Sequence, residues 1–333
     1  MSYGNALIIY RNHADRAGLT VPATTTVTGQ LDALQTRQAG EFAEFDGVGS
    51  ATPQVEIQFP AACRPTFWGL FGLNLTRVGP DELGDPPQVQ LHRWNPAADN
   101  WVEEPIQLPR DNGSCGHLGQ LMWLIPASGS HADRWRLTLH WTTQISQGRP
   151  QNRRIGRLWA ARPTQDIVTL EHGVDINWSR YPVDLGDHGL VADGSGTASA
   201  GPIVRGYRFT ASAVPDLPMW GFTDGASEVG QVASIDNLQY TIGTTGEVII
   251  LPRTSHPLWI HRLGVRGWLP RGIGWQSSGA GLHTLTGEIQ EYGGGPRIPA
   301  PESDGNGGIG IGSEALLPAG EKLTGKAKFH ATE

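Results

Sequence analysis

The chain has 333 residues, of which 38% are apolar and 17% charged, with 45 Gly, 24 Pro and a net charge of −7 at pH 7. Glycine and proline make up about a fifth of the chain, which disfavours long helices and indicates short strands joined by turns. The 25 Lys and Arg residues form no run beyond Arg153-Arg154, so the charge pattern excludes a nucleic-acid surface, which needs clustered cations.

Alternating apolar and polar residues predict strands in the first half of the chain. The clearest case is the segment 134–141 (RWRLTLHW), whose Trp and Leu residues fall on one face. The most apolar run, 66–76 (TFWGLFGLNLT), is too short to cross a bilayer and predicts a strand buried on both faces. Further strands are predicted at 6–10, 54–59, 89–94 and 118–125. This spacing is typical of two packed antiparallel sheets.

A polar loop at 142–152 predicts a domain boundary. The composition changes again after residue 292. Strands are predicted between these two points at 203–211, 247–251, 259–269 and 281–292. The last 41 residues are rich in Gly and Pro and poor in aromatics, so they cannot build a core of their own. The sequence therefore predicts an all-β chain with two β-sandwich-type domains, in residues 1–150 and 151–292. Residues 293–333 are predicted to be an extended C-terminal arm, ordered against a neighbouring subunit.

No residue spacing indicates catalysis or metal binding. The serine-elbow pattern GxSxG is absent, and His and Asp residues lack the spacings of zinc and calcium sites. The carboxylate pairs Glu103-Glu104 and Asp184 with Asp187 are interpreted as solvated faces, because sequence spacing cannot place them across a sugar. We therefore expect no enzyme activity, no cofactor and no bound metal.

Four tryptophans and two cysteines are the remaining candidates. Trp94, Trp101, Trp220 and Trp275 lie beside turns, where an exposed ring can stack on a sugar or a partner; packing in a core is the competing interpretation. Cys63 and Cys115 are expected to be unpaired thiols in a cytoplasm, or one disulfide if the protein leaves the cell. No basic region precedes the apolar run 6–10, so neither a signal peptide nor a membrane span is expected.

Four segments follow one another along the chain: RNHADRAGLTVPATTTVTG, FWGLFGLNLT, RWRLTLHW and RIGRLWAA. In this order, residues 1–160 resemble a group of tailed-bacteriophage virion proteins with a galactose-binding-like (discoidin-type) sandwich. The segments VDINWSRYPVDLGDHGLVADGSGTASAG and VRGYRFTASAVP are similar to the part that follows the sandwich in such proteins. The ligand-contacting loop residues of sugar-binding members of the superfamily are not matched.

The resemblance implies a non-enzymatic structural component of a phage tail tip or baseplate, with a galactose-binding-like jelly roll as its first domain. Such a protein is assembled in the host cytoplasm, resides in the virion tail and forms a threefold or sixfold homo-oligomer. Its partners are other virion tail proteins, which it bridges to fibres or receptor-binding parts. The alternative is a carbohydrate-binding module that contacts host surface glycans. A third hypothesis is a hydrolase whose active site is not visible in the sequence.

Overall fold

The computed structural model describes residues 5–37, 41–45, 52–73, 89–108, 120–139, 145–146, 149–150, 153–171, 174–190, 196–221 and 232–291. Contacts divide the chain into one compact unit, Met1–Ile298, and a second unit, Pro299–Glu333. The predicted arm, residues 293–333, lies outside the described residues. The prediction of an all-β chain is confirmed, since strands far outnumber helices in the described part.

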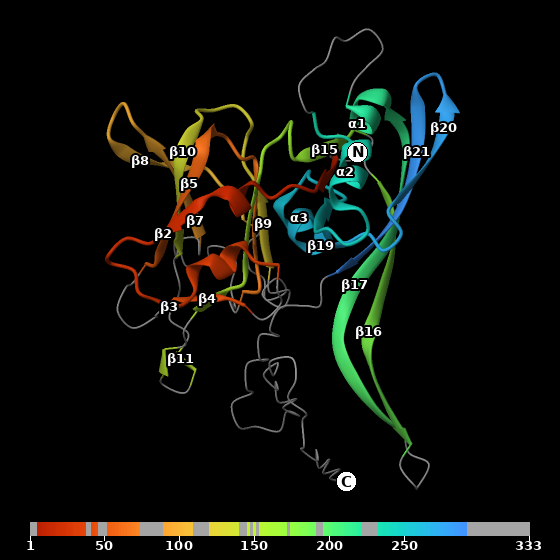
Figure 1. Ribbon diagram of the computed structural model, residues 1–333, viewed down its shortest axis with the longest axis horizontal. Coiled ribbons are helices and arrows are strands. Elements are labelled where there is room, and N and C mark those ends of the chain that lie inside the picture. The colour runs from red at the N-terminus through yellow and green to blue at the C-terminus, as the bar shows by residue number, and fades with distance from the viewer. Residues whose placement is uncertain are drawn as a thin grey trace. The chain divides into compact units, whose positions relative to one another are not determined.

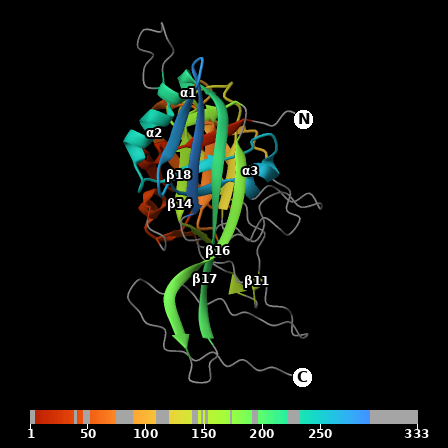
Figure 2. The same ribbon diagram turned by 90° about the vertical axis from the view of Figure 1, so that its right-hand side faces the viewer.

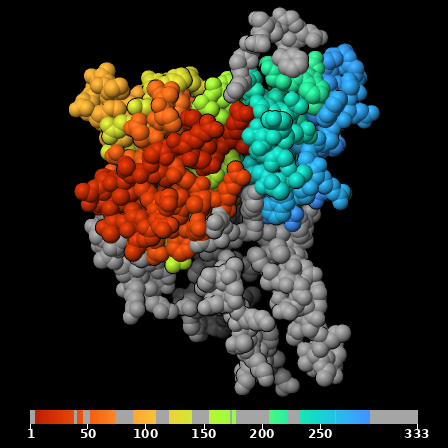
Figure 3. All heavy atoms as spheres, in the orientation of Figure 1, coloured from red at the N-terminus to blue at the C-terminus, as the bar shows by residue number. Residues whose placement is uncertain are grey.

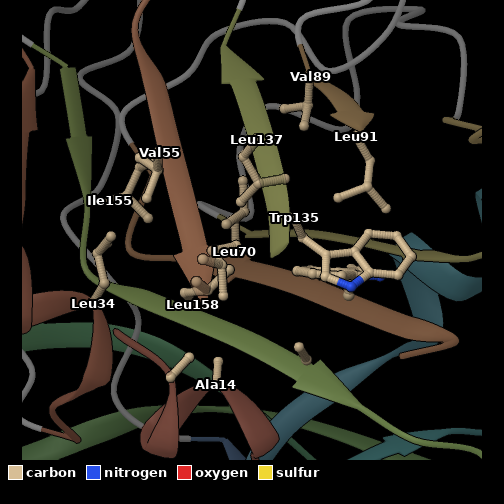
Figure 4. Packing of buried hydrophobic residues seen from close by; sticks show 14 of the residues in the cluster. Ala14, Leu34, Val55, Leu70, Val89, Leu91, Trp135, Leu137, Ile155 and Leu158 are labelled. Atoms are coloured by element: carbon tan, nitrogen blue, oxygen red, sulfur yellow. The ribbon is translucent and has the colours of Figure 1, made fainter. Parts of the chain in front are cut away.

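A β-sandwich is formed by two antiparallel sheets (Figure 1). The five-stranded sheet has the order β2 (Gly18–Thr20), β5 (Gln54–Cys63), β10 (Ala132–Leu139), β7 (Val89–Asn95), β8 (Asn100–Glu104). The three-stranded sheet has the order β14 (Arg157–Ala161), β6 (Phe67–Phe71), β9 (Gln120–Leu124). Leu137 and Val55 of the larger sheet face Leu70 and Leu158 of the smaller one in a single core (Figure 4). Alternation of side chains along each strand therefore places apolar residues inside, as predicted.

Short elements close one side of this sandwich. They are η1 (His13–Arg16), η2 (Leu31–Gln35) and a sheet of β3 (Val27–Gly29), β4 (Ala43–Phe45) and β13 (Arg153–Ile155). The strands β11 (Ile145–Ser146) and β12 (Arg149–Pro150) pair with each other. Ala14 of η1 and Leu34 of η2 are buried in the same core as Leu158 (Figure 4). The short helices thus seal the sandwich rather than form a layer of their own.

The second β-rich region is one eight-stranded antiparallel sheet. Its order is β15 (Ile167–Leu170), β1 (Ala6–Ile9), β18 (Val248–Leu251), β19 (Val265–Trp268), β21 (Leu282–Glu291), β17 (Gly196–Pro215), β16 (Asp175–Leu190), with β20 (Ile273–Gly279) also paired to β21. Helices α1 (Asp216–Trp220) and α2 (Ile235–Ile242) pack on one face, where Met219 and Leu238 join the sheet's core. The expected second sandwich is therefore a single sheet with helices on one face.

Two local predictions need correction. The strand predicted at 6–10 exists, but β1 belongs to the large sheet, because Ile8 is buried on one face of that sheet and Ile9 on the other. The predicted division at residue 150 therefore does not separate the sheets, since β1 joins the large sheet and β14 joins the sandwich. The strand predicted at 259–269 begins as a helix, α3 (Pro257–Leu263). Proline is favourable at the first helical position, and His256 Nδ1 accepts a hydrogen bond from the Leu258 amide, 3.1 Å away.

Strands β16 and β17 continue beyond the large sheet as a two-stranded ribbon. β17 pairs with β21 only between Gly206 and Pro215, whereas it pairs with β16 as far as Gly196. Figures 1 and 2 show both strands passing the end of the sheet. Beyond Gly206, β17 is therefore paired with β16 and not with β21.

The three-stranded sheet is buried on both faces. All five residues of β6 are buried, with Trp68 and Leu70 facing the sandwich core and Phe67 and Phe71 facing the large sheet. The prediction of a strand buried on both faces is confirmed for residues 67–71, while residues 74–76 lie outside the described part. This sheet is thus a middle layer that belongs to two cores at once.

A buried ion network joins the same two layers. Arg157 of β14 is 1% exposed and pairs with Asp15 of η1 at 2.5 Å and with Glu247 at 2.8 Å. Glu247, which is 2% exposed, also binds Arg266 of β19. Burial alone would raise the pKa of Glu247, but Arg266 and Arg157 outweigh it and lower that pKa below its ordinary value. The two arginines therefore keep Glu247 ionised although it is buried.

We expect Glu247→Gln to lower the free energy of unfolding by about 3–5 kcal/mol, because it removes the buried carboxylate charge that Arg157 and Arg266 share. Urea unfolding at neutral pH measures this. The matched control is Glu288→Gln, which breaks an exposed pair with Arg208 and should change stability by about 0.5 kcal/mol or less. Equal effects of the two substitutions would contradict the role given to the network.

The same network predicts a dependence on pH. Because the folded-state pKa of Glu247 is depressed, its contribution is present above the unfolded-state pKa and is lost as pH falls through the folded-state value. The difference in unfolding free energy between the wild type and Glu247→Gln should therefore shrink in acid. A difference that stays constant down to the acid transition would show that ionisation of Glu247 is not its cause.

Candidate functional site

The structure brings the four candidate tryptophans together as two pairs. The rings of Trp94 and Trp101 have centroids 5.2 Å apart at 64°, and those of Trp220 and Trp275 have centroids 5.1 Å apart at 87°. Both arrangements are edge-to-face, the geometry that aromatic pairs prefer. The first pair lies on the sandwich and the second on the large sheet, so they are separate candidate sites.

The first pair is set by the register of the β7–β8 hairpin. Trp94 is directly opposite Trp101 across the two strands, and Leu91 is buried in the sandwich core. Side chains alternate along a strand, so Trp94, three positions from Leu91, projects from the outer face. Both tryptophans are half-buried there. The strand predicted at 89–94 is thus one arm of a hairpin, and its two tryptophans are in contact.

Charged side chains from two other strands complete this outer face. The guanidinium of Arg134 lies 4.7 Å from the ring centroid of Trp94, and that of Arg136 lies 4.0 Å from the centroid of Trp101. Glu56 of β5 accepts from Arg136 at 2.6 Å and lies 3.6 Å from Arg134. We call these five residues, Trp94, Trp101, Arg134, Arg136 and Glu56, the tryptophan–arginine face.

A buried charge cluster supports the hairpin from beneath. Arg64 donates to both carboxylate oxygens of Glu104, at 3.1 and 2.9 Å, and Arg93 lies 2.7 Å from the same group. Glu104 is 6% exposed, so interpreting Glu103-Glu104 as a solvated pair is wrong for its second member. Alternation explains this, since Glu103 points outward and Glu104 inward. The side chains of Asp184 and Asp187 are outside the described part.

In the second pair, Trp220 of α1 contacts Trp275 of β20. Figure 3 shows the green and the blue parts of the chain side by side in this region. The ring of His283 is 5.6 Å from that of Trp220 and 5.8 Å from that of Trp275, at 88° and 80°. His283 Nε2 lies 2.8 Å from Asp216 Oδ1. Trp275 is 48% exposed, and the side chain of Asp216 is 32% exposed. We call these four residues, Asp216, Trp220, Trp275 and His283, the indole corner.

Sequence reasoning identified all four tryptophans but none of their polar neighbours. Arg136 and Glu56 are 80 residues apart, and His283 and Asp216 are 67 apart, so no local motif links them. The alternation in the segment 134–141 does place both arginines on the outward side of their strand. That was the one signal from which a charged outer face could have been predicted.

Other site types find no support in the described part of the chain. No three His, Cys, Asp or Glu side chains come together there as a metal site would need. No helix among those residues is long and apolar enough to cross a membrane. Cys63 is a free, buried thiol whose pKa is raised by burial to about 12. Cys115 lies outside the described residues.

Comparison with known proteins gives distant structural neighbours only. No protein-family model and no curated protein matches the chain. The family 32 carbohydrate-binding module of Streptococcus pneumoniae EndoD is 14% identical with a TM-score of 0.31, and the match covers 46% of this chain and 99% of that one. CpGH89CBM32-4 of Clostridium perfringens, in complex with GlcNAc-alpha-1,4-galactose, is 11% identical with a TM-score of 0.31, covering 45% and 93%. Reduced XRCC1 bound to the DNA polymerase beta catalytic domain is 11% identical with a TM-score of 0.30, covering 47% and 99%.

Carbohydrate-binding modules thus stand among the structural neighbours of this chain. The sequence resemblance to phage virion proteins has no counterpart among the structures named here. With TM-scores near 0.3, these neighbours indicate no function by themselves.

Native Cys63 should resist alkylation by iodoacetamide at about pH 8, because the thiolate is the reactive species and burial disfavours it. In a Cys115→Ser variant, mass spectrometry should find Cys63 unmodified in the folded protein and modified in urea. Modification at the same rate in both states would contradict the burial of this thiol.

Proposed function

We propose that this chain binds carbohydrate through the tryptophan–arginine face of its sandwich. The observation that carries the proposal is the gathering of two indole rings, two guanidinium groups and one carboxylate on the outer side of one sheet. The binding requires no catalysis, and we propose that the chain is a binding protein rather than an enzyme.

The chemistry of a sugar ring matches this face. A pyranose has an apolar C–H surface that packs against an indole ring, and a rim of hydroxyls that both donate and accept hydrogen bonds. Arginine only donates and an ionised glutamate only accepts, so Arg134, Arg136 and Glu56 offer the two complementary roles. The side chain of Arg134 is 39% exposed, and Glu56 lies 3.6 Å from one of its nitrogens. Donor capacity therefore remains for a ligand.

Rigidity of the hairpin favours binding. The Arg64–Glu104–Arg93 cluster lies on the inner side of the same strands that carry Trp94 and Trp101. A side chain held in place before binding loses less conformational entropy when the ligand arrives. The buried cluster thus supports a preformed surface.

The virion role implied by the sequence resemblance would place this carbohydrate binding on a phage tail. A sugar-binding domain on a phage tail would contact glycans of the host surface, and a threefold or sixfold oligomer would multiply weak sites. This setting, including other tail proteins as partners, rests on the sequence resemblance alone. Carbohydrate binding by the isolated chain does not depend on it.

Trp94→Ala and Trp101→Ala should each weaken glycan binding by about tenfold or more, which corresponds to about 1.4 kcal/mol. A glycan array with the full chain identifies the ligand, and calorimetry measures the loss. The matched control is Trp259→Ala, since Trp259 is 38% exposed and also contacts an arginine, Arg253, but lies on α3.

The proposal fails if folded Trp94→Ala and Trp101→Ala variants bind the identified glycan as tightly as the wild type does. It also fails if the wild type retains no glycan on the array. Far-ultraviolet circular dichroism of each variant separates loss of binding from loss of fold.

A further inference from the structure

The two tryptophan pairs differ in whether the protein supplies its own cation. At the tryptophan–arginine face, arginines lie 4.7 and 4.0 Å from the ring centroids. At the indole corner, no cation lies over Trp220 or Trp275 among the described residues. A carboxylate, Asp216, is present at the indole corner, just as Glu56 is present at the tryptophan–arginine face. Among the described residues, the indole corner thus has no Lys or Arg partner for its rings or for its carboxylate, which pairs with His283 instead.

The adjoining sequence does not supply that partner. Residues 222–231 (FTDGASEVGQ), which follow Trp220, contain Asp224 and Glu228 and neither Lys nor Arg. In the β20–β21 hairpin the basic residue nearest Trp275 is Arg271, which precedes β20 at the end away from the hairpin turn. The ten residues after Gly221 therefore add no Lys or Arg to the sequence beside Trp220.

We propose that the indole corner binds a quaternary ammonium group. Aromatic faces attract cations held within about 6 Å of the ring centroid, and tryptophan does so best. Three ring planes that are close to mutually perpendicular surround such a group better than one ring does. Asp216 supplies the opposite charge, and its side chain is 32% exposed.

Methylated rather than primary ammonium fits the surroundings. Leu217 of α1, the helix that also carries Asp216 and Trp220, is 42% exposed, so apolar surface is available for methyl groups on that helix. A primary ammonium is strongly hydrated and donates hydrogen bonds that a leucine cannot accept. A trimethylammonium group has no such requirement.

His283 positions the carboxylate. It is 5% exposed, and its Nδ1 has no hydrogen-bond partner among the described residues. With the proton on Nε2, the ring donates to Asp216 and leaves a buried Nδ1 lone pair, which also favours a neighbouring positive group. His283 thus acts both as the third ring and as the support of Asp216.

The hairpin turn holds Asp216 from the other side. Gly281 has a φ of +69°, and a Cβ there would lie 2.7 Å from Asp216 Oδ2. Only glycine allows this approach without a clash. The carboxylate is therefore fixed between the turn and the imidazole.

The test uses calorimetric titration of the full chain with choline. Its uncharged isostere, 3,3-dimethylbutan-1-ol, has the same shape without the charge and should bind at least about tenfold more weakly. Trp275→Ala and Asp216→Asn should each weaken choline binding by about tenfold, whereas Trp275→Phe should retain most of it. Trp101→Ala is the matched control and should leave choline binding unchanged. An Nε-trimethyllysine amide, titrated in parallel, distinguishes a peptide side chain from a small molecule as the source of the group.

Several outcomes overturn the proposal. They are equal binding of choline and its isostere, no choline binding at millimolar concentration, and equal losses in Trp275→Ala and Trp101→Ala. Trp275-dependent binding of a neutral monosaccharide without choline binding would assign the corner to sugars and would also overturn it. If Trp275→Ala does not fold, Asp216→Asn decides, because asparagine still accepts the hydrogen bond from His283.

Discussion

Burial of the three-stranded sheet on both of its faces joins the two β-rich regions of this chain. Successive residues of β6 and β14 alternate between the sandwich core and the interface with the large sheet, so neither strand has a side that can be polar. Arg157 is the exception, and it is the residue that needs two carboxylates to be buried there. The three-stranded sheet therefore contributes side chains to both hydrophobic cores, and the compact unit depends on it.

Buried charges are paired with an opposite charge in both parts of the structure. Arg157 with Glu247 links the middle layer to the large sheet, and Arg64 with Glu104 links the loop before β6 to the edge hairpin of the sandwich. Each pair is costly to bury and more costly to break, since one partner alone would be an isolated charge in an apolar environment. A buried charge requires a partner of opposite charge at one position. Such pairs therefore constrain which strands pack together more specifically than apolar contacts do.

The two tryptophan pairs show how neighbours decide the chemistry of the same side chain. On the sandwich, arginines from β10 reach both indoles and a glutamate holds those arginines. At the end of the large sheet, an aspartate and a histidine meet two indoles, and no cation from the described residues joins them. The first arrangement offers hydrogen-bond donors around apolar rings, and the second offers negative charge beside apolar rings. Sugar and cation are the ligands that these two surfaces respectively suit.

Local sequence determined the strands, because alternation and the run of residues 67–71 reflect burial that each segment carries with it. It also identified the tryptophans as candidates, because an aromatic residue beside a turn can be recognised from its immediate sequence neighbours alone. Only the tertiary structure decided that β1 joins the large sheet, that residues 257–263 are helical, and which side chains surround each indole. Those outcomes depend on contacts between residues far apart in the chain, such as Arg157 with Glu247 at a separation of 90. Periodicity says which face of a strand is buried, but not which strand lies beside it.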